Sequence, residues 1–339
     1  MSGHLSAGLS SRTLTLEDAQ AVTDLLNVCS VSATGEKSFD FNEIVSDFSL
    51  PNLDLATHCH AVFSGEHLVG YAELWDFFEP YVRYACMVRV HPDFGGRGIE
   101  DYLWAWINSN ALRAAHKAPS HARIYLMTGV NSLETKVIGE LTAQGFQHVR
   151  STYRMQIEFD STLPAVTPPA GFTFRPFHPV EDSALVHACV QDAFRDHFGF
   201  LPMPFEQWRH WFIDIPDLVP ELWTLAYVGD DLAGVAMCAT HNSELPQHGY
   251  VHYLAVRRPF RRRGLGKALL LHSFKLFQDY GKIGVSLGVD THNLTGALKL
   301  YEDVGMRATS TYLRYEKELR LGVDLTVREL DPEPTTFKE

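Results

Sequence analysis

One pattern occurs twice along the chain, and this repeat limits the fold more than any other feature. Three segments of the first half return in the same order in the second half, with matching glycines 164, 166 and 160 residues apart. The pairs are AVFSGEHLVGYAELW (61–75) with LAYVGDDLAGVAMCA (225–239), RVHPDFGGRGIEDYL (89–103) with AVRRPFRRRGLGKAL (255–269), and AQGFQHVRSTYRM (143–155) with DVGMRATSTYLRY (303–315). We therefore expect two copies of one domain.

The segment DSTLPAVTPPAG separates the two copies. Its three prolines and its final glycine cannot continue a helix or a central strand. We predict a first domain over 1–160, a linker over 161–171, a second domain over 172–320 and a C-terminal tail over 321–339. A chain of 339 residues is long enough for two such domains.

Each copy has the pattern of an α/β domain. In the second copy, an amphipathic helix precedes a hairpin that turns at residues 229–231. A strand rich in β-branched and aromatic residues, YVHYLAV, leads through a basic turn into a helix over about 265–279 and then a strand over 283–289. The strand–helix–strand order implies one parallel pair with a right-handed crossover. We expect in each copy a mixed, mostly antiparallel twisted sheet flanked by helices.

The basic turn VRRPFRRRGLGKALL (256–270) stands out because the whole chain is acidic. Six of the eleven residues over 257–267 are Arg or Lys, whereas the formal net charge of the protein is −12. Gly264 and Gly266 lie where the strand becomes the helix, whose first amides have no partner inside the helix and carry the positive end of its dipole. A phosphate can approach such a backbone closely. The alternative is a solvated charged turn that only caps the helix.

The wider context of this turn resembles the GNAT superfamily of acyl-coenzyme A-dependent N-acyltransferases. An R-x-x-G-x-G turn between a strand and a helix is one half of that signature, and an Asn after the next strand followed by Ala and LYE…G on a helix is the other. The matching residues are Arg261, Gly264, Gly266, Asn293, Ala297, Leu300, Tyr301, Glu302 and Gly305. The resemblance is strong in the second half and faint in the first. It implies two tandem GNAT-like domains, an arrangement also found in mycothiol synthases.

The resemblance also implies roles for individual residues. The pantetheine arm of acetyl-CoA would pair with the backbone of one strand, and its pyrophosphate would lie against the backbone of the turn. The implied cofactor-binding residues are Leu254, Ala255, Val256, Arg261, Arg262, Arg263, Gly264, Leu265, Gly266, Lys267, Asn293 and Ala297. Tyr301 would protonate the departing thiolate. The alternative for Tyr301 is a core aromatic residue.

The first copy has lost these features. Gly95 replaces the leading arginine of the turn, Glu100 replaces the second glycine, and Leu141 occupies the position of the tyrosine. A carboxylate in the turn would repel a pyrophosphate. We expect a degenerate copy, because a fold can persist after its chemistry is lost. The alternative is a first copy that binds coenzyme A by a variant route.

The general base is less clearly marked. Members of the superfamily often carry a Glu near the start of the strand over 250–256, where this sequence reads Tyr250-Val251-His252. His252 is our first candidate, because imidazole titrates near neutrality. Period-two alternation would place it on one face with Tyr250, Leu254 and Val256. His241 and Glu244 are alternatives, and a structural role for His252 is also open.

Two further features have both a functional and a structural interpretation. The aromatic stretch FRDHFGFLPMPFEQWRHWF (194–212) would wall an acceptor pocket, or it would belong to the core or to an interface with the first copy. The segment THCH would place His58 and His60 on one strand face, but two ligands without a third do not make a zinc site. We expect no metal.

Together these features predict an N-acetyltransferase that transfers an acetyl group from acetyl-CoA to a primary amine of a small-molecule acceptor. The alternative is a non-catalytic acyl-CoA-binding regulatory module. The net charge of −12 argues against nucleic acid as a partner. No apolar run reaches the ~18 residues of a membrane helix. The N-terminus lacks an apolar signal core, and the odd number of five cysteines favours reduced thiols in a cytoplasm. A homodimer is compatible with the sequence.

Overall fold

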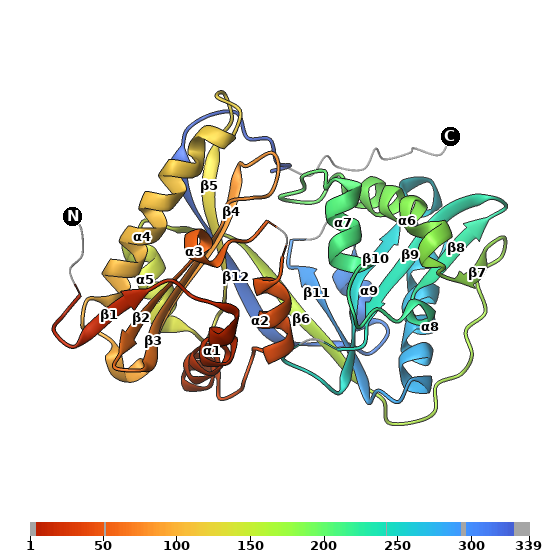
Figure 1. Ribbon diagram of the computed structural model, residues 1–339. Helices are drawn as coiled ribbons and strands as arrows, with labels where there is room; N and C mark the ends of the chain where they lie inside the picture. Colours follow the sequence, from red (N-terminus) through yellow and green to blue (C-terminus); the bar gives the residue numbers. More distant parts are fainter. Residues whose placement is uncertain (1–4, 51, 242, 293–295, 329–339) are drawn as a thin grey trace. The chain divides into compact units, whose positions relative to one another are not determined.

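The computed structural model describes residues 5–50, 52–241, 243–292 and 296–328. The chain forms two compact units (Figure 1). Unit 1 comprises Met1–Ser151 and Tyr312–Leu325, and unit 2 comprises Thr152–Thr311 and Thr326–Glu339. The predicted domains over 1–160 and 172–320 follow the sequence repeat and stay a prediction, whereas the compact units divide the chain inside two strands.

Unit 1 is a mixed sheet with the strand order β1-β2-β3-β4-β5-β12. Among the recorded pairings of these strands, only β4 with β5 is parallel. Its elements are β1 (Leu9–Arg12), α1 (Ala19–Thr34), α2 (Phe41–Phe48), α3 (Leu55–His58), β2 (Cys59–Ser64), β3 (His67–Trp75), β4 (Arg83–Val90), α4 (Ile99–Ala114), β5 (Ile124–Asn131) and α5 (Thr135–Ala143), with short 3-10 turns at Leu16–Asp18, Pro92–Phe94 and Ala115–Lys117.

Unit 2 repeats this plan with the strand order β6-β11-β10-β9-β8-β7. Only β10 with β11 is parallel among its recorded pairings. Its elements are β7 (Thr173–Pro176), α6 (Pro179–Phe194), α7 (Phe205–Phe212), β8 (Thr224–Val228), β9 (Asp231–Ala239), β10 (His248–Val256), α8 (Leu265–Asp279), β11 (Gly284–Asp290) and α9 (Ala297–Glu302), with 3-10 turns at Pro220–Leu222 and Arg258–Phe260. The predicted fold class, with a mixed and mostly antiparallel sheet flanked by helices, is confirmed.

The last strand of each sequence copy, β6 or β12, ends in the sheet of the unit that the other copy forms. Residues 152–158 of β6 (Gln147–Glu158) pair with β11 in unit 2, although β6 ends the first sequence copy. Residues 312–320 of β12 (Arg307–Arg320) pair with β5 in unit 1, although β12 ends the second copy. Each copy therefore gives the end of its last strand to the sheet of the other.

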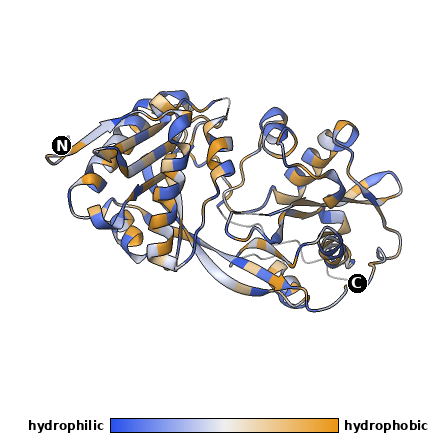
Figure 2. Cartoon of the chain, turned by 60° about the horizontal axis from the view of Figure 1, so that its bottom comes forward, coloured by the Kyte–Doolittle hydropathy of each residue, from blue (hydrophilic) through white to orange (hydrophobic). Residues whose placement is uncertain are grey.

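The core of unit 2 lies on both faces of its sheet. Helix α8 contacts β9, β10 and β11, whereas α6 contacts β9 and β10 from the opposite face (Figure 1). The helices contain both apolar and hydrophilic residues, as expected of amphipathic helices that pack on a sheet (Figure 2). None of the helices in the described part of the chain combines the length and the apolar character that crossing a membrane demands.

Candidate active site

An opening between β10 and β11 defines the candidate site in unit 2. The two parallel strands pair only from His248 with Gly284 to Val251 with Leu287. Beyond Val251 the recorded partner of β10 is β9 alone, while β11 continues alongside β6. The edge of β10 that faces the opening is therefore available to pair with an extended ligand, as in strand addition.

A β-bulge lies where the two strands part. Val251 pairs with Cys238 and Tyr253 with Met237, so the intervening His252 is an extra residue with no partner on β9. A bulge redirects side chains and interrupts period-two alternation. The prediction that Tyr250, His252, Leu254 and Val256 share one face is therefore wrong beyond the bulge.

The predicted strand residues border this opening on the side of β9. Leu254, Ala255 and Val256 pair with Ala236, Val235 and Gly234. Ala255 is buried, and the other two side chains are half-buried. These three residues thus border the opening, and the contact of their backbone with pantetheine stays a prediction.

The glycine turn follows directly. Gly264 is the N-cap of α8 and has a φ of 78°, a left-handed conformation that favours glycine. At Gly266, an added Cβ would be 3.8 Å from the nearest side-chain atoms of Val256 and Leu300. This is an ordinary packing distance, so protein packing does not require a glycine there. The bare backbone at the start of α8 fits the close approach of a phosphate.

The cations of the turn divide into two groups. Arg257 and Arg258 form ion pairs of 3.1 and 2.6 Å with Asp192 and Asp196 at the end of α6. Arg261 donates hydrogen bonds to the carbonyl oxygens of Val256 and Ala193, so its side chain braces the turn. These contacts reduce the charge of the cluster and fix its backbone.

The other cations of the turn are exposed. They are Arg262, Arg263 and Lys267. Arg263 lies over the ring of Phe172, 4.5 Å from its centroid. Lys267 belongs to the first turn of α8, next to the buried Leu265, which anchors the helix in the core. Positive charge thus surrounds the helix N-terminus.

Tyr301 lies on α9, which packs against β11. Its side chain is buried in the core of unit 2, and burial raises its pKa to about 12. The phenol is therefore protonated at neutral pH and can donate a proton. Ala297 begins the same helix, and Asn293, the other predicted contact of this segment, lies outside the described residues.

His252 lies on the face of the sheet that α6 and α7 cover. Its ring makes edge contacts with Phe212 of α7 and with Tyr250, at centroid distances of 5.7 and 4.9 Å. The side chain reaches solvent. The surrounding protein nevertheless lowers its pKa to about 4, with a smaller opposing effect from Asp217. This combination describes a neutral imidazole beside the rings of Phe212 and Tyr250.

The two alternative bases have other partners. His241 pairs through Nδ1 with the hydroxyl of Thr240 at 3.0 Å. Glu244 forms an ion pair of 3.2 Å with Arg154 of β6. His252 is therefore the best placed of the three candidates.

The comparison with known families agrees with this geometry. Residues 184–306 match the model of the acetyltransferase (GNAT) family. This range includes the bulge, the glycine turn and Tyr301. The chain contains a GNAT acetyltransferase domain. It is an acyltransferase, and acetyl-CoA is its cosubstrate.

Relatives extend this likeness over both units. A mycothiol acetyltransferase of Pseudarthrobacter chlorophenolicus is 28% identical over 76% of this chain and 75% of its own length. The crystal structure of a GCN5-related N-acetyltransferase from Sphaerobacter thermophilus aligns with a TM-score of 0.81 and 29% identity, covering 95% of this chain and 99% of that one. A tandem GNAT protein from the clavulanic acid biosynthesis pathway has a TM-score of 0.69 at 18% identity, over 93% of this chain and 100% of that one, and thus shares the fold.

The equivalent turn of unit 1 is occupied by protein side chains. Lys136 of α5 forms an ion pair of 3.2 Å with Glu100, and a Cβ at Gly95 would be only 2.8 Å from its Nζ atom. The ammonium group of Lys136 thus lies in the turn that corresponds to the glycine turn of unit 2. The sequence predicted that Glu100 would repel a pyrophosphate, but it did not predict the ion pair of Glu100 with Lys136.

The strand opening of unit 1 also differs from a GNAT cofactor groove. Strand β4 pairs with β3 without a register shift, so it lacks the bulge of β10. The buried Arg89 of β4 forms an ion pair of 2.9 Å with Glu134, which follows β5. Leu141, in place of the tyrosine, is buried. In unit 1 the ion pair of Arg89 with Glu134 therefore links β4 to the segment that follows β5.

The aromatic stretch of unit 2 is partly core. Trp208 is 1% exposed and packs against Trp223 at a centroid distance of 6.4 Å, which favours the core alternative for this residue. Phe212, the last residue of α7, packs against Trp208 and also contacts His252 and Tyr253. The sequence did not distinguish the two because both are aromatic residues of one amphipathic helix.

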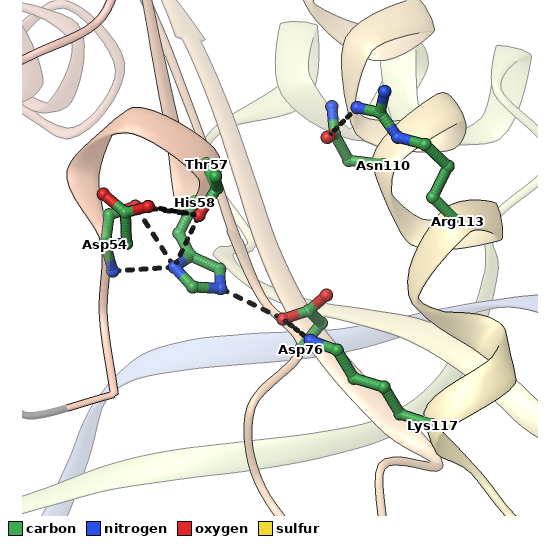
Figure 3. Close-up of polar contacts among 7 residues, drawn as sticks. All are labelled: Asp54, Thr57, His58, Asp76, Asn110, Arg113 and Lys117. Atoms are coloured by element: carbon green, nitrogen blue, oxygen red, sulfur yellow. Dashed lines mark hydrogen bonds and ion pairs between the residues drawn. The ribbon is translucent and has the colours of Figure 1, made fainter.

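The two histidines of THCH do not share a strand face. His58 ends α3, accepts a hydrogen bond from the backbone amide of Asp54 at Nδ1, and donates from Nε2 to Asp76 (Figure 3). Lys117 reaches the same carboxylate (Figure 3). His60 instead pairs with Tyr102. In the described ranges no group of three or more His, Cys, Asp and Glu side chains is suited to a metal ion.

Proposed function

We propose that unit 2 transfers the acetyl group of acetyl-CoA to a primary amine of a small-molecule acceptor. The observation that carries this proposal is the opening between β10 and β11, with a neutral His252 at its bulge and a protonated Tyr301 behind β11. The two groups come from opposite faces of the sheet. A base on one face and an acid on the other suit a displacement in which the acceptor enters on one side and the thiol leaves on the other.

The residues that would hold acetyl-CoA follow from the geometry. The backbone of 254–256 would pair with the pantetheine arm, and the amides that begin α8 at Leu265 and Gly266 would bind the pyrophosphate. The exposed cations Arg262, Arg263 and Lys267 would add charge around it. When bound, the cosubstrate supplies a thioester whose carbonyl carbon accepts the amine.

Proton transfer is the contribution of the protein side chains. In the proposed reaction, the amine nitrogen forms a bond to the acetyl carbon and the carbon–sulfur bond breaks. His252, neutral at physiological pH, accepts the proton that the nitrogen loses. Tyr301 gives its proton to the sulfur. The products are an amide and free coenzyme A.

The relatives support an N-acetyltransferase at the level of the reaction class. The structure from Sphaerobacter thermophilus is described as an N-acetyltransferase, which supports an amine acceptor without specifying which one. Release of coenzyme A, measured with acetyl-CoA and a panel of amines, tests the proposal. Acceptor-dependent release is expected. Tight binding of acetyl-CoA without release for any amine would instead indicate the regulatory binding module.

A further inference from the structure

We propose that the acceptor is a zwitterion with a carboxylate beside its amine, as in an α-amino acid, and that Arg154 and Glu244 recognise its two charges. This inference rests on the proposed function, because it concerns the same site. It is carried by the position of one ion pair relative to the bulge.

Arg154 lies on the face of the sheet from which the acceptor would enter. In the register of β6 it stands opposite Gly288 of β11, beside the parting of the strands. Its guanidinium lies over the ring of Tyr250, 5.2 Å from the centroid. The ring of Tyr250 in turn contacts the ring of His252 at 4.9 Å. One aromatic ring thus separates the guanidinium from the proposed base.

No side chain rises from β11 at the position beside Arg154 and Tyr250. Gly288 is exposed and carries no side chain, and a Cβ there would be 3.7 Å from the hydroxyl oxygen of Tyr250. Glu244, from the loop between β9 and β10, pairs with Arg154 at 3.2 Å. Opposite charges, an aromatic ring and an imidazole therefore follow one another along one face.

The burial of this ion pair argues for recognition. The side chains of Arg154 and Glu244 are only 14% and 20% exposed. Withdrawing two charges from water costs free energy that an apolar pair of similar volume would not, so such a pair is weak evidence for stability alone. A guanidinium binds a carboxylate through paired N–H donors. A carboxylate attracts the ammonium form in which an amine arrives at neutral pH.

An amino-acid acceptor satisfies both charges at once. Its carboxylate would bind Arg154, and its ammonium group would be attracted by Glu244 and then lose a proton to solvent before the neutral amine reacts. Phe212 and Tyr250 would contact the apolar part of the acceptor. The competing interpretation is that the pair only ties the β9–β10 loop to β6.

The test compares α-amino acids with their own amides in the coenzyme A release assay. The wild-type protein should give a higher kcat/KM for at least one acid than for its amide. Arg154→Gln should lower kcat/KM for that acid roughly 10- to 100-fold, the range for a hydrogen bond to a charged group, and change the value for the amide little. Affinity for acetyl-CoA should stay the same.

Two further variants separate recognition from folding. The double variant Arg154→Glu with Glu244→Arg keeps an ion pair, so it should melt like the wild type yet lose the preference for the acid. Arg175→Gln breaks the ion pair of Arg175 with Asp182, which joins β7 to α6, and should lower the melting temperature without changing the preference.

Several results would overturn the inference. One is an equal kcat/KM of the wild-type protein for acids and for their amides. Another is a preference for the acid that persists in Arg154→Gln or in the double variant. Coenzyme A release with simple amines but no preference for acids contradicts this inference alone. Absence of release with every amine contradicts the proposed function as well.

Discussion

At the scale of single residues, the site depends on two groups whose protonation is set by their surroundings. Burial raises the pKa of Tyr301 to about 12, and the enclosing protein lowers that of His252 to about 4. At pH 7 the first is therefore a protonated acid and the second an unprotonated acceptor. Burial alone also fits the core interpretation of Tyr301, so the two roles must be separated by kinetics.

We expect Tyr301→Phe to keep acetyl-CoA affinity and slow turnover. The phenylalanine ring fills the same space, while the proton donor is lost, which typically costs about 10²–10⁴-fold in rate. Single-turnover kinetics together with calorimetric binding check this. An unchanged rate of the chemical step would assign Tyr301 to packing.

His252→Gln should slow the reaction by a similar factor at every pH between about 6 and 9, since the wild-type imidazole stays unprotonated throughout that range.

The lowered pKa of His252 also predicts that stability depends on pH. The unfolded chain binds a proton near the ordinary pKa of 6.5 and the folded chain only near 4, so the free energy of unfolding falls as pH drops between these values. Urea unfolding at pH 7 and pH 5 should show a smaller pH dependence in His252→Gln than in the wild type. Equal pH dependence would contradict the lowered pKa.

At the scale of elements, α7 contains both core and site residues. Trp208→Ala should destabilise the protein by about 3–5 kcal/mol, because it removes a buried tryptophan. Phe212→Ala should lower the melting temperature less, because Phe212 is only partly buried, and should alter kcat/KM among acceptors, since Phe212 lies beside His252. Thermal melts and acceptor kinetics of the two variants check this contrast. A change of acceptor preference in Trp208→Ala with normal melting would contradict the assignment.

The elements also show what the sequence could and could not predict. The glycine turn and its helix were predictable, because Gly264 and Gly266 constrain the backbone locally. The bulge at His252 left only an indirect signal: the offset between the copies rises from 164 at Gly234 to 166 at Gly264, and the bulge accounts for one of the added residues. The end of β6 in unit 2 was not predictable, because strand pairing depends on residues far apart in the sequence. For the same reason, neither Lys136 beside Glu100 nor Arg154 beside Glu244 was predicted.

At the scale of the whole molecule, two copies of one fold have different sites. Unit 2 has the bulge, the open glycine turn and the tyrosine, whereas in unit 1 Lys136 and Glu100 pair within the turn. Each unit also depends on the other copy for the end of one strand. The first sequence copy thus supplies residues 152–158 to the sheet of unit 2.

The most direct test of this account is calorimetric titration of the full chain with acetyl-CoA. We expect about one molecule bound per chain, and loss of binding in Gly266→Glu, which places in unit 2 the carboxylate that Glu100 provides in unit 1. As a control, Glu100→Gln should leave the stoichiometry unchanged. Two equivalent sites per chain, or full affinity in Gly266→Glu, would contradict the assignment of a single site to unit 2.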